Sequence, residues 1–215
     1  MTSFLAVLAG VLVGAAPLDS QLVLQNYARA LAAVKTPAYA IYSYAVSQAG
    51  PNDIEQRHRI YRAGLDVRDE TISIDGSRPK AAAIAIGKRG DRYAVGLLAP
   101  RPGAYELLFV RAIAAAGRTD YVFDATPLAK AATGFVVSRV TVDGETFLPR
   151  SIVFRSSSLA ARGDGEVRYA PFGAYWMPVL ATISGTVGGR PARERIAFGE
   201  YRFPTSLPPS TFGKR

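Results

Sequence analysis

The strongest constraint on the fold is a series of strand patterns separated by turn signals from Val140 to Phe212. It includes the run VDGETFLP at 142–149, in which Asp143-Gly144 stands between alternating apolar segments. Such an Asp-Gly pair predicts a tight hairpin, because both central residues of that turn need positive φ. Further hairpin turns are expected at 163–165, 170–173 and 187–190. With a turn signal roughly every 8–15 residues, the pattern predicts a four- or five-stranded antiparallel meander.

The same stretch carries a family resemblance. The segments VDGETFLPRSIVF, YWMPVLATI and ERIAFGEYRFPTSLPPSTF resemble the C-terminal half of the LolA/LolB-like proteins, which are bacterial extracytoplasmic lipoprotein-sorting and lipid-binding proteins. The resemblance implies an α+β fold with a strongly curved antiparallel sheet, an unclosed β-barrel, covered by an N-terminal helix and a small helical plug. In that family the concave face of the sheet takes acyl chains.

The N-terminus is typical of a secretory signal peptide. Residues 4–16 are apolar or Gly and end in small residues, whereas a membrane span needs about 20 residues. The n-region has no Lys or Arg, and the chain has no cysteine, which excludes a lipoprotein anchor, disulfides and thiolate metal sites. We therefore expect residues 1–16 to be a signal peptide, residues 17–215 to form a single domain, and the protein to be secreted or periplasmic.

After the N-terminus, one helix and then a run of strands are expected. Residues 19–35 show apolar side chains at helical spacing after a capping Asp19 or Ser20, and Pro37 stops the helix. From Ala38 the period changes to two, which predicts strands over 38–46, 54–62 and 65–74. Arginines at 57, 59, 62 and 68 then line up across neighbouring strands, either as an anion-facing patch or as a solvated face with cross-strand ion pairs.

The middle of the chain is the least regular part. Residues 88–91 predict a hairpin turn, so that the strand 92–99 would pair back on the strand 81–87. Residues 105–110 fit a strand, but 107–116 fit a short helix equally well. We predict the helix and place it as the plug at the mouth of the curved sheet.

The sequence offers no recognisable catalytic set, and neither a metal site nor a cofactor is expected. His58 is the only histidine, so a histidine metal cluster is impossible, and a Ser-His-Asp triad would have to use it. No serine lies in a Gly-x-Ser-x-Gly motif. Several carboxylates are available for glycosidase chemistry, but most adjoin arginines or turns. A non-enzymatic role is therefore expected, with a secreted hydrolase as a remaining alternative.

The predicted site is a hydrophobic cavity whose walls come from aromatic and branched side chains. The candidates are Tyr42, Tyr44, Ile60, Ile84, Ile86, Val95, Leu97, Val153, Trp176 and Met177. Trp176 and Met177 are adjacent in a strand, so at most one of them should point inward. Proteins of the resembling family carry an arginine on a strand that regulates cargo, and Arg68 stands near the corresponding position.

Together these features predict reversible binding of a lipid, lipoprotein or other amphipathic ligand by a monomer. An envelope sensor or protein-interaction domain on the same fold is the alternative. The net charge of +9 favours acidic partners such as an anionic membrane surface or cell-surface polymer. The basic residues are scattered rather than blocked, which argues against nucleic acid.

Overall fold

The computed structural model describes residues 19–50, 53–81, 83–115, 117–129, 135–157, 161–187 and 190–213. The predicted signal peptide at 1–16 lies outside the described residues, as does the centre of the predicted turn at 187–190. The helices are α1 (Ser20–Ala33), α2 (Val95–Leu98) and a final 3₁₀ turn, η1 (Pro209–Phe212). The strands are β1 (Tyr39–Ala49), β2 (Ile54–Ala63), β3 (Asp66–Ile74), β4 (Ile84–Lys88), β5 (Tyr105–Ala115), β6 (Arg118–Pro127), β7 (Phe135–Asp143), β8 (Pro149–Ser157), β9 (Ala161–Phe172), β10 (Tyr175–Val187) and β11 (Arg190–Arg202).

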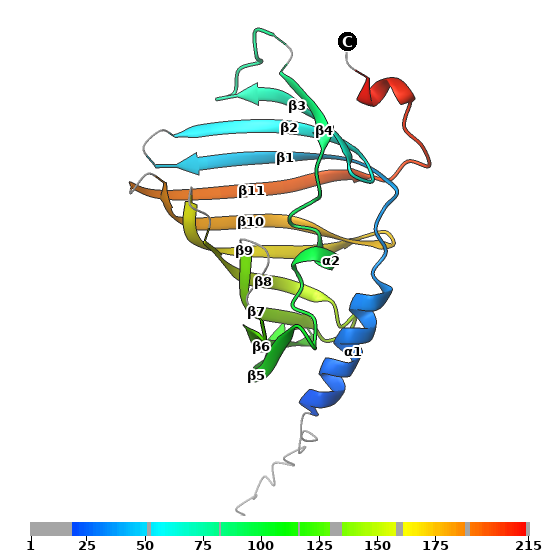
Figure 1. The fold of residues 1–215 in the computed structure, drawn as a ribbon, viewed down its shortest axis with the longest axis vertical. Coiled ribbons are helices and arrows are strands. Elements are labelled where there is room, and N and C mark those ends of the chain that lie inside the picture. The colour runs from blue at the N-terminus through cyan, green and yellow to red at the C-terminus, as the bar shows by residue number, and fades with distance from the viewer. Residues whose placement is uncertain are drawn as a thin grey trace, which may run out of the picture.

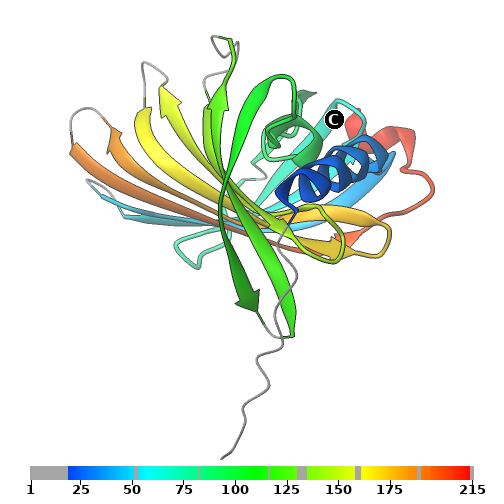
Figure 2. The same ribbon diagram turned by 90° about the horizontal axis from the view of Figure 1, so that it is seen from below.

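Within the described residues these strands form one antiparallel sheet in the order β4-β3-β2-β1-β11-β10-β9-β8-β7-β6-β5. The sheet is strongly curved and does not close on itself (Figures 1 and 2). The first and last strands pair with each other in its interior, with Ser43 of β1 opposite Gly199 of β11. The predicted curved, unclosed sheet with an N-terminal helix is confirmed, and so is the C-terminal meander, which comprises β7 to β11.

The strands β4 and β5 follow each other in sequence but lie at opposite edges of the sheet. The chain between them, Arg89 to Ala104, passes over the concave face and contains α2 (Figures 1 and 2). We call residues 89–104 the crossing segment. The predicted pairing of 92–99 with 81–87 is therefore wrong, because β4 pairs with β3 alone among the described strands and the chain then leaves the sheet.

The helix α1 covers part of the concave face beside the crossing segment (Figure 2). As predicted, Asp19 caps it, because its carboxylate accepts hydrogen bonds from the amides of Gln21 and Leu22. The side chains of Val23, Tyr27 and Leu31 recur at helical spacing and are buried. The Tyr27 hydroxyl donates to the carbonyl of Pro100 at 2.9 Å, which ties α1 to the crossing segment.

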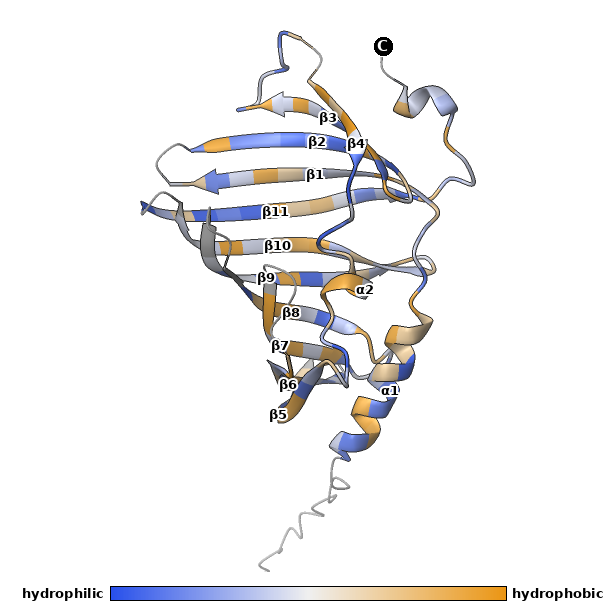
Figure 3. Ribbon diagram, viewed as in Figure 1, coloured by the Kyte–Doolittle hydropathy of each residue, from blue (hydrophilic) through white to orange (hydrophobic). Residues whose placement is uncertain are grey.

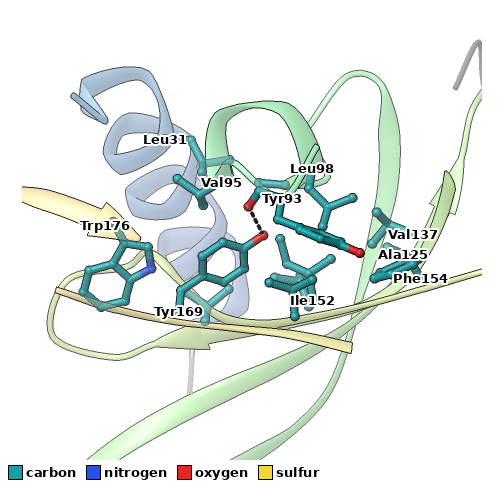
Figure 4. Packing of buried hydrophobic residues seen from close by; sticks show 14 of the residues in the cluster. Leu31, Tyr93, Val95, Leu98, Ala125, Val137, Ile152, Phe154, Tyr169 and Trp176 are labelled. Carbon is teal, nitrogen blue, oxygen red and sulfur yellow. Dashed lines mark hydrogen bonds between the residues drawn. The ribbon is translucent and has the colours of Figure 1, made fainter. Parts of the chain in front are cut away.

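The main core lies between these covering elements and the concave face of β6 to β11. Figure 4 shows Leu31 of α1 and Val95 and Leu98 of α2 packed over Ile152 and Tyr169 of the sheet. The Tyr169 hydroxyl donates to the Tyr93 carbonyl at 3.0 Å, so the crossing segment is bonded to the sheet at the centre of this cluster.

The predicted helix plug at 107–116 is wrong, because its described residues, 107–115, lie in strand β5. Strand β5 pairs along β6, and the side chains of Leu107 and Phe109, two residues apart, pack against the main core. The Phe109 ring lies edge-on to that of Phe123, with 5.7 Å between the ring centroids. The short helix that does lie over the concave face is α2, a single turn within the crossing segment.

Two of the three Asp-Gly pairs of the chain, Asp75-Gly76 and Asp143-Gly144, lie at turns, and these two turns differ. Asp75 and Gly76 both have positive φ, and Ile74 and Ser77 exchange two backbone hydrogen bonds around them, which is a tight two-residue hairpin. At Asp143-Gly144 the turn is longer, and Phe147 takes the positive φ instead. Gly144 is needed there for space, because an added Cβ would lie 1.9 Å from the carbonyl oxygen of Thr119.

The predicted hairpin turn at 163–165 is also wrong, because these residues lie inside β9. The Phe154 ring covers Gly165, at 2.4 Å from where a Cβ would be. This glycine therefore makes room for an aromatic side chain on the neighbouring strand rather than bending the backbone.

Candidate functional site

A groove lies on the concave face, between the crossing segment and strands β1, β2 and β11. It encloses about 450 Å³, within the range of small-molecule sites in proteins. Its lining residues are Tyr42, Tyr44, Val46, Arg62, Arg89, Gly90, Asp91, Arg92, Tyr93, Glu194, Ile196 and Phe198. The groove occupies the part of the concave face nearest β1, beside the main core.

The floor of the groove follows from strand alternation. Tyr42, Tyr44 and Val46 recur every second residue on β1, and Ile196 and Phe198 do so on β11. The register places Val46 opposite Ile196 and Tyr44 opposite Phe198, so these side chains share one face. The Phe198 ring also lies 5.9 Å from that of Tyr93 on the crossing segment, which joins the floor to its cover.

Charged side chains form the rim. The Arg62 guanidinium donates to the carbonyl of Arg89 at 2.8 Å, while its Nε is buried and has no hydrogen-bond partner within the described part of the chain. The Arg92 guanidinium lies over the Tyr93 ring at 4.8 Å from its centroid. Asp91 accepts from the Tyr93 amide at 3.1 Å. The groove is thus amphipathic, with aromatic and branched side chains below and ionic groups around its opening.

Asp69 of β3 holds the start of the crossing segment against the sheet. Its carboxylate accepts from Arg89 at 2.6 Å and from the Tyr44 hydroxyl at 3.1 Å, and it bonds His58 Nδ1 at 2.8 Å. Burial alone would raise the pKa of Asp69, but the hydrogen bonds from His58 and Arg89 outweigh it, and the pKa is lowered. Asp69 is therefore ionised at neutral pH and anchors Arg89.

His58 is the residue on which a catalytic triad would depend. Its ring stacks on Tyr44 at 4.6 Å, and its Nε2 lies 3.1 Å from the side-chain oxygen of Gln56. Its Nδ1 is bonded to Asp69 and its Nε2 to Gln56, and among the described residues no serine hydroxyl bonds either nitrogen. Burial raises the pKa of Tyr44, whose hydroxyl donates to Asp69.

The structure brings some predicted cavity residues to the groove and its surroundings. Tyr42 and Tyr44 line the groove, and burial raises the pKa of Tyr42 to about 12. Ile60 is buried with Tyr42 in a small cluster on β1 to β3. Trp176 and Met177 are both buried, and together with Val95 they border a separate cavity of about 70 Å³ near the end of α1. Their burial does not contradict the prediction that at most one of them points inward, because Trp176 belongs to the main core whereas Met177 is not part of it.

The other predicted cavity residues lie elsewhere. Ile84 and Ile86 are exposed on edge strand β4, opposite Glu70 and Arg68 on the convex face. Leu97 on α2 is 63% exposed. Val153 pairs with Arg139 and Glu166, next to the inward Ile152, and so also faces outward. An alternating pattern shows that a strand has two faces, but not which of them is concave.

Sequence reasoning missed Val46, Ile196, Phe198 and the charged start of the crossing segment. The alternation of Tyr42 and Tyr44 continues to Val46, so that residue could have been found. Arg89 and Tyr93 could not, because they were expected in a hairpin at the edge of the sheet.

Arg68 lies on the convex face of β3, away from the groove. Its guanidinium bonds Glu70 at 2.7 Å and donates to the carbonyl of Thr211 at 3.2 Å. It thereby holds η1 against the outside of the sheet.

A second set of buried charges fastens the loop after β7. The Asp143 carboxylate accepts from the amide of Thr146 at 2.8 Å and from Arg150. Asp120 lies beside it and bonds Arg150 as well. Burial tends to raise the pKa of Asp143, but the bonds from Thr146, Glu145 and Arg150 lower it. This arrangement is structural, because each carboxylate is already occupied by donors of the loop and the neighbouring strands.

No group of three or more metal-ligating side chains occurs among the described residues. No helix in this part of the chain is both long and apolar enough to cross a membrane.

Comparison with known proteins supports the fold. No protein-family model matches the sequence, and no curated protein matches it. Among solved structures, a DUF1329 family protein from Desulfovibrio piger superposes with a TM-score of 0.51 at 12% identity, covering 90% of this chain and 96% of that one.

Two other solved structures cover similar shares. A LolA superfamily protein from Nitrosomonas europaea has a TM-score of 0.47 at 15% identity, covering 92% of this chain and 98% of that one. A domain described as an outer membrane lipoprotein-sorting protein, from Vibrio parahaemolyticus, has a TM-score of 0.48 at 14% identity, covering 88% and 95%. At such identities the likeness is one of fold alone, and it is carried by the Desulfovibrio protein.

Proposed function

We propose that this protein is an extracytoplasmic, non-enzymatic carrier that reversibly binds one lipid, lipoprotein or other amphipathic molecule by its acyl chain. The observation that carries the proposal is the groove of about 450 Å³ on the concave face, with its apolar floor and ionic rim. An acyl chain would lie along Tyr42, Tyr44, Val46, Ile196 and Phe198, and its polar head would meet the rim.

The physical chemistry of the groove supports this role. Each methylene removed from water contributes about 0.8 kcal/mol, so a partly enclosed chain already gives useful and reversible affinity. The rim arginines offer donors to a head group, and Arg62 Nε is a buried donor without a protein partner in the described residues.

The sequence supports the location. The apolar residues 4–16 are typical of a secretory signal peptide, and the C-terminal motifs resemble those of LolA/LolB-like proteins. We therefore place the carrier outside the cytoplasm.

A pair of tryptophan substitutions on β1 tests the proposal. Val46→Trp would fill the groove, whereas Ser47→Trp adds the same ring one residue later, on the exposed opposite face. With a long-chain fatty acid carrying a fluorophore as probe, we expect Val46→Trp to weaken binding by about tenfold or more, equivalent to about 1.4 kcal/mol. Ser47→Trp should bind as the unaltered protein does.

Two outcomes would contradict the carrier. One is equal binding by both variants at matched thermal stability. The other is the absence of fatty-acid uptake together with no bound lipid in native mass spectra of protein purified from its own cell envelope.

A further inference from the structure

The convex face carries a cluster of arginines on the side of the sheet opposite the groove. They lie on the two strands that flank β1, and we call the four of them the arginine band: Arg57 and Arg59 on β2, and Arg193 and Arg195 on β11. Figure 3 shows β2 as hydrophilic along most of its length and β11 as hydrophilic over its first half.

Strand register places the band on the convex face. Arg57 is opposite Ala45 of β1 and Arg195 is opposite Ser47, whereas the intervening Val46 faces the groove. Arg59 and Arg193 are opposite Ser43 and Ala49 in the same way. The arginines therefore flank a strip of small side chains on β1, which consists of Ser43, Ala45, Ser47 and Ala49. Two arginines of β11 lie beside one half of this strip, and two of β2 lie beside the other half.

The strip from Ser43 to Ala49 is about 20 Å long at about 3.3 Å per residue. Arg193 and Arg195 are exposed, the side chain of Arg57 is 68% exposed, and Arg59 is half-buried. The positive charge is thus spread along an accessible track with no bulky residue in its middle.

These cations are poorly compensated. Within the described residues, Arg59, Arg193 and Arg195 have no ion pair, and Arg57 has only a 3.9 Å contact with the exposed Glu55. Glu70, the cross-strand neighbour of Arg59, is taken by Arg68, and Glu166 by Arg168. Like charges two residues apart on one face repel each other, so a partner that neutralises them would be favoured.

We propose that the arginine band binds an extended acidic polysaccharide, whose carboxylates would follow β1 across the convex face. A small anion could meet only one end of the band, whereas a chain of regularly spaced carboxylates could meet all four arginines. The strip offers only Ser and Ala side chains, so it has no aromatic ring on which nucleic-acid bases would stack. The face is convex and the strip exposes no large apolar side chain, which is unfavourable for a flat bilayer (Figure 2).

The test uses polygalacturonate as the probe and galacturonate monomer as its single-charge counterpart. Binding to the full chain is measured by calorimetry at several salt concentrations. The band variant replaces four cations by serine: Arg57, Arg59, Arg193 and Arg195. The control variant makes the same change of charge at four exposed positions outside the band: Lys35, Arg78, Lys80 and Lys88.

We expect the unaltered protein to bind the polymer with an affinity that falls as salt rises, and to bind the monomer far more weakly. The band variant should lose about tenfold or more, whereas the control should change less than about twofold. Equal losses in the two variants, at unchanged circular dichroism and thermal midpoint, would overturn the proposal. So would monomer binding as tight as that of the polymer, or tighter binding to oligothymidylate or to phosphatidylglycerol vesicles than to polygalacturonate. Fatty-acid uptake should be the same in all three proteins, since the groove opens on the other face.

Discussion

Beneath α1 and the crossing segment, strands β6 to β10 bury their concave side chains almost completely, whereas β1, β2 and β11 leave a groove of about 450 Å³. We call these the packed half and the open half of the sheet. The strands of both halves alternate in the same way. The difference lies in the cover, because α1 and α2 contribute Val23, Tyr27 and Leu98 to the packed half. The start of the crossing segment contributes charged Arg89, Asp91 and Arg92 to the open half, and these do not fill it.

The comparison shows that one strand pattern can produce either a packed core or an open groove. Which of them results depends on whether the covering element brings apolar or ionic side chains. The crossing segment does both along its length, with ionic Arg89, Asp91 and Arg92 followed by buried Tyr93, Val95, Leu98 and Ala99.

The largest expected difference between the halves is the cost of removing an aromatic ring. Phe123 in the packed half is fully buried, so Phe123→Ala should lower the free energy of unfolding by about 3–5 kcal/mol. Phe198 in the open half borders the groove and is only partly buried, so Phe198→Ala should cost about 1–2 kcal/mol. Urea denaturation of both variants measures this, and equal losses would mean that the open half is as tightly packed as the other.

A smaller effect is expected from adding one methyl group in the packed half and one on edge strand β4, which the packed half does not include. At Gly165 in the packed half, a Cβ would meet the Phe154 ring at 2.4 Å, so Gly165→Ala should destabilise the protein by about 1–3 kcal/mol. Gly87 on β4 has nothing within 4 Å of such a Cβ, and Gly87→Ala should change stability by less than about 0.5 kcal/mol. Thermal unfolding followed by circular dichroism checks both. A neutral Gly165→Ala would show that Phe154 can move aside.

The smallest expected effect concerns pH and two buried aspartates, Asp143 in the packed half and Asp69 on β3, which bonds Tyr44 and Arg89 of the groove. The pKa values of Asp143 and Asp69 both lie below the ordinary value of 3.8. As pH falls, these carboxylates therefore take up protons in the unfolded chain before they do so in the folded protein. Each carboxylate contributes its full share of the unfolding free energy above about pH 5, and this share is lost as pH falls through the folded-state pKa. Asp143→Asn and Asp69→Asn should each flatten the dependence of unfolding free energy on pH between about pH 5 and 2.

Denaturant unfolding at a series of pH values measures that slope. An Asp69→Asn variant with an unchanged slope would show that the pKa of Asp69 is the same in the folded and unfolded chain, so that its bonds to His58 and Arg89 do not favour the ionised carboxylate.

The sequence predicted the parts of the fold that depend on local periodicity. The capped helix from Asp19, the strands of the C-terminal meander and the curved, unclosed sheet are all present. The turn at Asp143-Gly144 was wrong because the Asp143 side chain bonds the backbone of Glu145 and Thr146, which opens the turn into a longer loop. At Asp75-Gly76 the Asp75 side chain accepts instead from the amide of Glu55 on the neighbouring strand, and the tight turn forms.

The parts that depend on distant contacts could not be predicted. The apolar residues 107–116 satisfy either period, and their pairing with β6 decides for the strand. The crossing segment reaches the opposite edge of the sheet, and no local pattern encodes that connection. Tyr42 and Tyr44 were predicted as cavity residues because they follow a local strand alternation. Arg89 and Tyr93 complete the groove from the crossing segment, so local alternation could not identify them.

The pairing of the first strand with the last has a consequence for how the chain is made. Ser43 and Gly199, which are hydrogen-bonded neighbours, are separated by 156 positions in sequence. During synthesis, β1 can acquire β2 on one side, but its other edge stays unpaired until β11 has been produced. Such long-range closure slows folding. A nascent molecule of this kind therefore remains incompletely folded until β11 has been synthesised, close to the end of translation.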